Sequence, residues 1–294
     1  MAIPKPSTQS LGATVVINPD VLAKYKDLLT DLQNLGSAVV AYSGGVDSTF
    51  LAYAAYQALQ SQVIAVTAES PSYSDTDRCD ALRFAKQIGI RHIFVQTSEI
   101  ENEAYAVNDA NRCYFCKEEL FLRLGDFQKQ HPEYKHALYG PVTDDLSDYR
   151  PGMKAAVLAG ARAPLVEAKL SKAEVRILSL HFGLDSWDKP AAPCLSSRVA
   201  YGEYITKEKL TQIEQAEAFV RAEGFLEFRV RHHADIARLE LQTSDFAKFF
   251  SDGRRTRIIE NLKSLGYRYV TLDAQGFRSG SMNDLLESLP IVQG

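Results

Sequence analysis

The sequence predicts an α/β fold in which a parallel sheet is followed by a smaller α+β domain. Short, apolar and partly β-branched runs at 38–42, 62–69 and 92–97 have the pattern of buried parallel strands. Stretches with apolar residues at helical spacing separate these runs, as in right-handed βαβ units. After about residue 190 the pattern changes to a long helix followed by paired strands. We therefore expect two domains, at 1–190 and 191–294.

The elements of the first domain follow from periodicity and from end signals. Apolar residues at helical spacing predict helices at 19–35, over the residues after the 43–48 loop, and at 74–88. Ser171 precedes Glu174 by three residues, a capping box that opens a helix to about residue 181. Besides the three strands named above, short apolar segments predict a fourth strand at 137–140 and a fifth at 164–167, whereas residues 1–18 are polar and irregular.

The second domain has a different order of elements. Residues 206–223 form a long amphipathic pattern that ends before Gly224, which is typical of a helix with a C-terminal glycine. Two strands at 228–233 and 236–241 are joined by a short turn, and a helix at 255–265 precedes a last strand at 267–273. This order predicts an α+β domain.

Composition limits the class of protein. The 294 residues are 46% hydrophobic and 24% charged, and the net charge is −4. These are ordinary values for a soluble globular protein, and the acidic balance gives no global attraction to nucleic acid. No run has the length of a signal peptide or a membrane span, so we expect a cytoplasmic protein. Four cysteines are too few for a disulfide framework in a chain of this length.

A glycine loop between strand and helix is the most informative motif. Residues 43–48 read Ser-Gly-Gly-Val-Asp-Ser and follow directly on a predicted buried strand. Backbone N–H groups of such a loop, with the positive end of the next helix, can bind a pyrophosphate, and Asp47 can orient a donor or hold Mg²⁺. The Gly-Lys-Ser/Thr ending of a Walker A loop is missing. The alternative is a tight turn that merely uses small residues.

Cysteines form a second candidate site. Cys113 and Cys116 are three residues apart at the start of a predicted helix, and therefore lie on the same side of it. Cys194 lies far downstream in a loop, and parallel-sheet loops can bring the three thiols together. Three thiolates can hold a [4Fe–4S] cluster with one open iron, or a zinc ion with an open position. The alternatives are a redox pair or buried small residues, and Cys79, among apolar neighbours on a helix, is expected in the core.

Arginines in the second domain form a third candidate site. Arg229 and Arg231 are two residues apart on a predicted strand, so both guanidinium groups leave the same face. Such a pair suits a phosphate monoester or carboxylates, and Arg278 can join it. Glu240 and Asp273 end neighbouring strands and can bind a cation or position an arginine. The alternative is a solvated strand face with surface ion pairs.

With these residues in view, the chain resembles one family of PP-loop ATP pyrophosphatases over nearly its whole length. This is the LarE family of ATP-dependent sulfur transferases. The 41–48 stretch matches the superfamily, and the family-specific stretches lie further along the chain, at 148–152, 160–162, 196–198, 229–240, 269–273 and 276–280. The resemblance implies a Rossmann-like PP-loop domain that cleaves ATP between the α- and β-phosphates.

The resemblance also implies a substrate and a role for each candidate residue. Family members thiolate pyridinium-3,5-biscarboxylic acid mononucleotide on the way to the nickel-pincer nucleotide of lactate racemase, and they form homo-oligomers. In some members a cysteine at the Cys194 position gives up its own sulfur, but those members lack the Cys113–Cys116 pair. The implied ATP-binding residues are Ala41, Ser43, Gly44, Gly45, Asp47, Ser48 and Thr67; the implied substrate-binding residues are Arg198, Arg229, Arg231, Arg278 and Glu240; and the implied cluster ligands are Cys113, Cys116 and Cys194.

Two other functions remain open at this stage. A tRNA thiolase of the PP-loop group also uses three cysteines around a cluster, but it needs a basic surface that the charge of −4 and the sparse Lys/Arg runs do not favour. A non-catalytic nucleotide sensor would bind ATP and a partner. The sequence does not identify the physiological sulfur donor.

Overall fold

The computed structural model describes residues 17–147 and 151–278, which form two compact units. The first unit comprises the described parts of residues 1–69, 75–97 and 117–192, and the second those of residues 70–74, 98–116 and 193–294. Residues 70–74 and 98–116 lie early in the chain but belong to the second unit. Some residues of three predicted segments lie outside the described residues: 1–16 of the irregular start at 1–18, 148–150 of the matched stretch at 148–152, and 279–280 of the matched stretch at 276–280.

A four-stranded parallel sheet is the centre of the first unit. Its order is β3 (Arg91–Gln96), β2 (Val63–Glu69), β1 (Ala38–Ala41) and β4 (His136–Leu138). Ala38 pairs with Val63 on one side and with His136 on the other, so β1 is central. All of β1 is buried, which is why its sequence is an uninterrupted apolar run. The predicted α/β class with a parallel sheet is confirmed.

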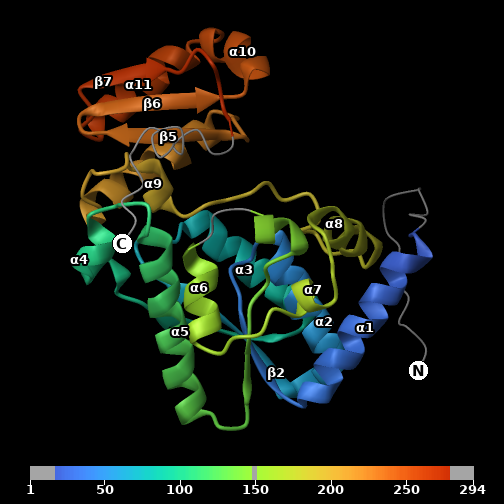
Figure 1. Cartoon of the computed structure of the whole chain (residues 1–294). Helices are drawn as coiled ribbons and strands as arrows, with labels where there is room; N and C mark the ends of the chain where they lie inside the picture. Colours follow the sequence, from blue (N-terminus) through green and yellow to red (C-terminus); the bar gives the residue numbers. More distant parts are fainter. Residues whose placement is uncertain (1–16, 148–150, 279–294) are drawn as a thin grey trace. The chain divides into compact units, whose positions relative to one another are not determined.

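Helices cover both faces of this sheet (Figure 1). On one face, α5 (Arg112–Gln130) and α6 (Pro151–Leu158) contribute Leu120, Phe121, Leu124, Phe127 and Ala156 to a core with Val39, Ile64 and Val66. On the other face, α2 (Val46–Leu59) packs against β1 and β2. The helices α1 (Pro19–Leu35), α3 (Asp75–Ile88) and α8 (Lys172–His181) pack in turn against α2.

The predicted fifth strand at 164–167 is wrong. Those residues form a single helical turn, α7 (Pro164–Glu167), with Pro164 at its first position. Proline has no N–H to give to a sheet ladder, and its fixed φ suits the first turn of a helix. Arg162, two residues before this turn, makes an isolated parallel bridge to Leu138.

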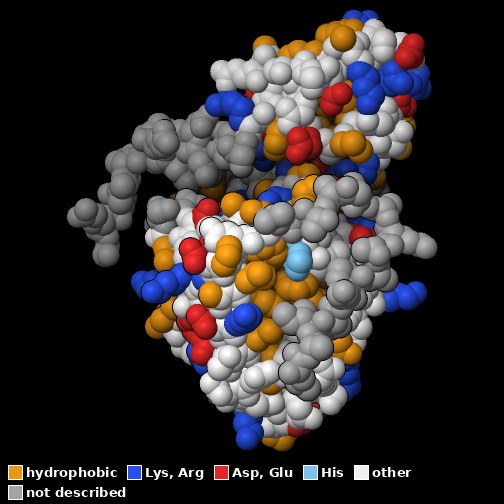
Figure 2. Space-filling model, turned by 90° about the vertical axis from the view of Figure 1, so that its right-hand side faces the viewer, with side chains coloured by type: hydrophobic (Ala, Val, Ile, Leu, Met, Phe, Trp, Pro, Cys, Tyr) orange, Lys and Arg blue, Asp and Glu red, His pale blue; other side chains and the backbone are white. Residues whose placement is uncertain are grey.

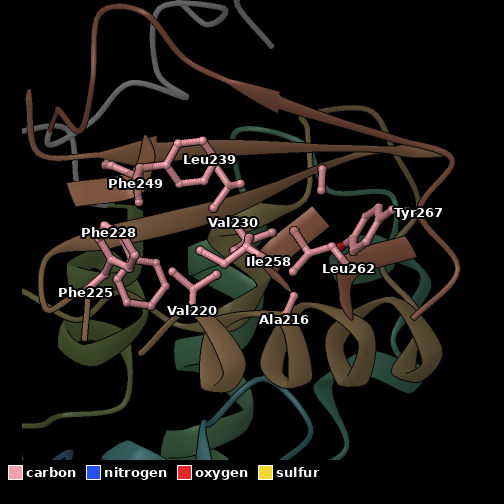
Figure 3. Close-up of a cluster of buried hydrophobic side chains, with 12 residues drawn as sticks. Ala216, Val220, Phe225, Phe228, Val230, Leu239, Phe249, Ile258, Leu262 and Tyr267 are labelled. Carbon is pink, nitrogen blue, oxygen red and sulfur yellow. The ribbon is translucent and has the colours of Figure 1, made fainter. Parts of the chain in front are cut away.

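The second unit contains a three-stranded sheet. A hydrophobic core of this unit lies between that sheet and two helices. β5 (Phe228–His233) pairs antiparallel with β6 (Ile236–Leu241), which pairs parallel with β7 (Tyr269–Leu272). The parallel pair is possible because α10 (Phe246–Phe250) and α11 (Arg254–Ser264) connect β6 to β7. Figure 3 shows side chains of α9 (Lys207–Ala222), α11 and the strands pointing toward one another, among them Val220, Phe228, Val230, Leu239 and Ile258.

Several end signals act as expected. The capping box at Ser171 and Glu174 is present with both of its hydrogen bonds, and Thr206 caps α9. Cys79, however, is exposed on α3, so its expected place in the core is wrong. The buried face of α3 is made by Ala81, Phe84, Ala85 and Ile88 instead.

The surface agrees with a chain of mixed charge. On the face drawn in Figure 2, described Lys and Arg side chains are interspersed with Asp and Glu. None of the described helices is long and apolar enough to cross a membrane. The remaining short helix, α4 (Glu103–Ala106), lies in the second unit.

Candidate active site

The 43–48 loop joins the carboxyl end of β1 to the start of α2. Gly45 is the N-cap of α2 and has no side chain with which to cap the helix; its N–H donates to Ser43 Oγ at 3.4 Å, and its carbonyl accepts from the Ser48 hydroxyl at 3.2 Å. The two serine hydroxyls close the loop on itself: Ser48 Oγ accepts from the Ser43 N–H at 3.2 Å and lies 3.1 Å from Ser43 Oγ. N–H groups at the start of a helix are unsatisfied within the helix and point toward an anion. The loop therefore has the geometry of a phosphate site.

Two glycines make this loop possible. Gly44 has a φ of +69°, and a Cβ there would lie 2.9 Å from the Cα of Ala81. Gly140, after β4, passes so close to α2 that a Cβ would lie 3.2 Å from the Ser48 nitrogen. A side chain at either position would displace the loop from its neighbours. Close packing at two points thus fixes the loop.

Asp47 is the charged side chain of the loop. Its Oδ2 lies 2.5 Å from Lys172 Nζ, whereas its buried Oδ1 has no hydrogen-bond partner. Burial raises the pKa of Asp47, and this effect exceeds the opposing influence of Lys172. A buried carboxylate oxygen without a partner is a cost that a bound cation or donor can offset.

Two lysines flank the loop, and the sequence reasoning missed both. Lys172 contacts Asp47 from the first position of α8. Lys189 donates to the Gly44 carbonyl at 3.3 Å and pairs with Asp77 and Asp80 of α3 at 3.0 and 2.9 Å. The capping box of Ser171 and Glu174 predicted the helix that begins at Lys172. It did not predict the contact between Lys172 and Asp47, because these two residues are 125 positions apart in the sequence.

The other predicted ATP-binding residues have mainly buried side chains. Ala41 ends β1, and Thr67 lies in β2 with 1% of its surface exposed. The Thr67 hydroxyl donates to the Tyr42 carbonyl at 2.7 Å and lies 2.8 Å from His92 Nε2. The structure thus uses the Thr67 side chain to connect neighbouring strands.

The three predicted thiol ligands all belong to the second unit. Cys113 and Cys116 lie in the first turns of α5, and Cys194 precedes the short turn Leu195–Arg198. Among the described residues none of the three forms a disulfide; Cys113 is exposed, and Cys116 and Cys194 are half-buried. Cys116 also packs against an apolar cluster that contains Tyr105, Leu195 and Val199.

Hydrogen bonds connect the segment before Cys113 with the segment after Cys194. Tyr105 Oη lies 2.6 Å from Ser196 Oγ, and Asn108 Nδ2 donates to the carbonyls of Val199 and Ala200. Arg112 Nη1 donates to the Ser196 carbonyl at 3.0 Å. These buried contacts bring together two segments that are more than 80 residues apart in the chain.

Electrostatic contacts also connect the two segments. Burial raises the pKa of Tyr105, and Cys194 and Cys116 raise it further. Burial likewise raises the pKa of Tyr201, and the neighbouring Cys113 and Cys194 raise this pKa further. Two tyrosines are therefore each close to thiols of both segments. In the part of the chain that the structure describes, however, no three His, Cys, Asp or Glu side chains converge as ligands of a metal ion.

Arg198 is a buried anchor of the Cys194 loop. Its Nε and Nη2 form a two-point ion pair with Glu217 of α9 at 2.9 and 3.0 Å. Its Nη1 donates to the Cys194 carbonyl at 3.1 Å and to the Pro193 carbonyl. Glu217 also accepts from the Val230 N–H, so α9, β5 and the Cys194 loop meet at one carboxylate.

The paired arginines of β5 are buried, at 8% exposure for Arg229 and 5% for Arg231, so the alternative of a solvated strand face is wrong. Arg231 pairs with the fully buried Glu240 at 2.8 Å and donates to the Ser197 carbonyl. Glu240 also pairs with Arg238, which lies 3.5 Å from Asp273. These contacts form an ionic chain in which Arg231 and Glu240 are buried and the other two members are partly exposed, and Arg231 connects it to the Cys194 loop.

Arg229 differs from Arg231 in its surroundings. Its guanidinium lies 5.0 Å from the Phe277 ring and donates to the Phe228 carbonyl. Burial and the neighbouring Arg198 lower the pKa of Arg229 to about 10. Arg278, the last described residue, is exposed.

Comparisons with known proteins agree with this arrangement. The NAD synthase family model matches residues 22–124, which include the 43–48 loop. An uncharacterized protein of Synechocystis sp. is 43% identical over 271 residues, covering 90% of this chain and 98% of the relative. The pyridinium-3,5-bisthiocarboxylic acid mononucleotide synthase of Lactiplantibacillus plantarum is 38% identical over 266 residues, covering 90% of this chain and 95% of that protein.

A more distant relative covers the same length. An uncharacterized protein of Methanocaldococcus jannaschii is 25% identical over 258 residues, 88% of this chain and 97% of the relative. Since the match to the Lactiplantibacillus synthase extends through both units, the family resemblance is not restricted to the loop. The chain belongs to the family of that synthase, the LarE-type PP-loop sulfur transferases, and is an ATP-dependent sulfurtransferase.

Proposed function

We propose that this enzyme activates a carboxylate of pyridinium-3,5-biscarboxylic acid mononucleotide with ATP and replaces one carboxylate oxygen with sulfur. The name of the Lactiplantibacillus relative gives the bisthiocarboxylic acid as that protein's product. The observation that carries the sulfur chemistry here is the joining of the Cys113–Cys116 and Cys194 segments by Tyr105, Asn108 and Arg112.

The first step is adenylylation. The 43–48 loop would hold the ATP phosphates on the N–H groups of α2, and Asp47, positioned by Lys172, would hold Mg²⁺ or orient a donor. A substrate carboxylate oxygen attacks the α-phosphorus, the bond to the β-phosphate oxygen breaks, and pyrophosphate leaves. The acyl adenylate that results has AMP as its leaving group, which a free carboxylate lacks.

The second step replaces AMP with sulfur. We propose that Cys113, Cys116 and Cys194 hold a [4Fe–4S] cluster, since three soft thiolates suit iron–sulfur ligation. Each of the three thiolates would serve as a ligand, and when bound the cluster would supply a position open to exogenous sulfide.

The buried arginines would bind the substrate. Arg229 carries a charge that burial and Arg198 both disfavour, and a phosphate group placed near it would offset that cost. Arg231 and Glu240 would support the same strand through their ion pair, and Arg278 would approach from the loop after β7. We assign the substrate phosphate to Arg229, Arg231 and Arg198 together.

A sacrificial use of Cys194 is the second candidate. Arg198 donates to the carbonyls of Pro193 and Cys194, and Arg231 donates to the Ser197 carbonyl. These bonds would hold the half-buried thiol of Cys194 in a defined position for attack on the acyl adenylate. The Cys113–Cys116 pair has no function in that route. We therefore prefer the cluster, and we propose further that the enzyme works as a cytoplasmic homo-oligomer.

Product analysis tests the proposal. With labelled ATP, Mg²⁺ and the mononucleotide, we expect AMP and pyrophosphate to form in equal amounts and only when the mononucleotide is present. ADP and phosphate as products would contradict the assignment. Filter binding with tRNA serves as the control for a tRNA thiolase, and we expect no retention at physiological salt.

A further inference from the structure

Lys189 is a largely buried lysine whose amino group contacts the 43–48 loop. Its side chain is 12% exposed. Its Nζ donates to the Gly44 carbonyl at 3.3 Å and lies 3.0 Å from Asp77 Oδ1 and 2.9 Å from Asp80 Oδ2. An ammonium group has three N–H donors, and these three acceptors can take all of them. The amino group therefore has a defined position, with its donors directed at the protein itself.

The backbone of Lys189 is also held in place. Arg176 of α8 donates from Nη1 to the Trp187 carbonyl at 2.6 Å and from Nη2 to the Lys189 carbonyl at 2.9 Å. The planar guanidinium thus fixes the segment that carries the lysine at two points. Lys189 therefore connects the loop to α3 and to α8, and all of these elements belong to the first unit.

The contact with Gly44 orients a whole peptide group of the loop. None of the peptide bonds of the described residues is cis, so the Gly44 carbonyl and the Gly45 N–H point in opposite directions. A carbonyl directed at Lys189 therefore directs the Gly45 N–H toward the other side of the loop. There this N–H lies 3.4 Å from the Oγ of the exposed Ser43, at the start of α2, where a helix can bind an anion.

We propose that Lys189 is a positioning residue of the 43–48 loop. By binding the Gly44 carbonyl, it keeps the Gly45 N–H directed at the phosphate groups of ATP. The lysine acts through the peptide group and not by contact with the nucleotide, because its own donors are directed at Gly44 and the two carboxylates of α3. This inference rests on the proposed binding of the ATP phosphates by the loop.

A second effect of Lys189 has to be separated from this one. Its charge also compensates the charges of Asp77 and Asp80, and without it these carboxylates would repel a polyanion bound to the loop. A variant that lacks only the lysine combines both effects. A variant that also lacks the two carboxylate charges shows the loss of the contact with Gly44 alone.

Calorimetry with pyrophosphate and Mg²⁺ measures binding to the loop without the reaction. Lys189→Met, which has a side chain of similar length, should weaken pyrophosphate binding at least about tenfold, the scale of one charge-assisted hydrogen bond. The triple variant Lys189→Met/Asp77→Asn/Asp80→Asn should be weakened to a similar extent. The matched control is Lys24→Met, which removes a lysine that pairs with Glu174 at 2.7 Å in the same unit and should leave pyrophosphate binding unchanged.

Nuclear magnetic resonance can observe the peptide group itself. Gly-Gly occurs once in the sequence, at 44–45, so a chain labelled with carbonyl-¹³C and ¹⁵N glycine gives one signal that correlates the Gly44 carbonyl with the Gly45 N–H. Pyrophosphate should shift the N–H of this signal in the wild-type chain. Lys189→Met should shift its carbonyl even without pyrophosphate, whereas Lys24→Met should not.

Two results would overturn the inference. One is Lys189→Met that binds pyrophosphate as tightly as wild type, and the other is a triple variant that regains wild-type affinity, because repulsion by the carboxylates would then explain the loss. If Lys189→Met does not fold by circular dichroism, the triple variant decides by the same criterion, since it carries no carboxylate deprived of this lysine. A wild-type Gly44–Gly45 signal that pyrophosphate does not shift would overturn the proposed role of the loop and this inference with it. A shifted wild-type signal together with full binding by Lys189→Met would overturn this inference alone.

Discussion

The phosphate loop of the first unit and the thiol region of the second are built in opposite ways. The loop is six consecutive residues whose candidate ligand groups are mainly backbone N–H donors, and glycines fix its shape. The thiol region joins side chains from 105–116 and 194–201 through a buried network. A backbone site depends on local conformation, whereas a side-chain site depends on contacts between distant segments.

The two regions also differ in the partners of their buried charged side chains. In the loop, Asp47 faces Lys172, and one of its oxygens remains without a partner. In the thiol region, the buried Arg112 donates to two neutral groups, the Asn108 side-chain oxygen and the Ser196 carbonyl. Each region thus keeps one buried charge only partly compensated, as expected for a site that receives a ligand of opposite charge. Substitutions of the cysteines, of Asp47 and of the arginines of β5 test whether these residues act in binding or only in folding.

The largest expected effect is the loss of the thiol site. Changing Cys113, Cys116 or Cys194 to Ser should abolish both iron binding and thiocarboxylate formation, because each thiolate would serve as a ligand. Cys79→Ser, at an exposed position on α3, is the matched control and should change neither. Iron and sulfide analysis after anaerobic reconstitution gives the readout. A Cys113 or Cys116 variant with full iron would remove that residue from the site.

Asp47→Asn should reduce AMP formation by at least about 100-fold, since the loop would lose the group that positions the reacting phosphate. The stability of the Asp47→Asn variant should not fall with its activity. Because burial raises the pKa of Asp47, the ionised carboxylate lowers stability at neutral pH. We expect the melting temperature of the Asn variant at pH 7 to equal or exceed that of wild type, and this difference to vanish at a pH below the ordinary pKa of Asp.

The control for Asp47 is Asp126→Asn, an exposed carboxylate of α5 whose pKa is lowered by a hydrogen bond from Lys129. That variant should keep full activity. A large fall in melting temperature for Asp47→Asn would indicate that Asp47 supports the fold and not the reaction.

Substitutions of the two arginines of β5 should separate the effect on mononucleotide binding from the effect on the stability of the fold. Arg229→Ala and Arg231→Ala should each weaken mononucleotide binding by about 1.5–3 kcal/mol, the range for a charge-assisted hydrogen bond. Arg231→Ala should also destabilise the fold by about 3 kcal/mol, because the fully buried Glu240 loses one of its two cations. Arg229→Ala should cost much less, because burial and Arg198 already disfavour its charge.

Calorimetry with the mononucleotide and denaturant unfolding measure these two effects. ATP affinity should be nearly unchanged in both variants and serves as the internal control. Normal mononucleotide binding by both variants would show that Arg229, and Arg231 with its ionic chain, have only a structural role.

The smallest expected effect concerns pH. Burial lowers the pKa of His92 to about 4, so the ring is neutral in the folded chain. The unfolded chain gains a proton near pH 6.5 and the folded chain does not, so stability should fall as the pH is lowered from about 6.5 to 4. His92→Gln should reduce this dependence, as followed by urea unfolding at several pH values. An unchanged pH dependence would show that other groups cause it.

The sequence predicted the loop site far better than its surroundings. Gly44, Gly45 and the apolar run before them carry their conformation locally, so strand, loop and helix were all confirmed. Lys172 and Lys189 were missed because they approach from residues more than 120 positions away. Local pattern cannot report such contacts.

The errors have local physical causes as well. The fifth strand was expected from a short apolar run, but Pro164 favours a helical turn. Cys79 was expected in the core because its neighbours are apolar, yet it lies on the exposed side of α3, away from the buried residues of that helix. In the second unit the strand pair was predicted from alternation, whereas Glu217, Arg112 and the early segments 70–74 and 98–116 gave no sequence signal of their tertiary roles.

The central claim is that sulfur is carried by a renewable centre and not taken from the chain. The direct test incubates the anaerobically reconstituted enzyme with ATP, Mg²⁺, the mononucleotide and excess sulfide, then counts product per chain and determines the intact mass of the protein. We predict several thiocarboxylates per chain and an unchanged mass at Cys194. Product that stops at one sulfur per chain, together with a chain lighter by one H₂S at Cys194, would contradict the claim.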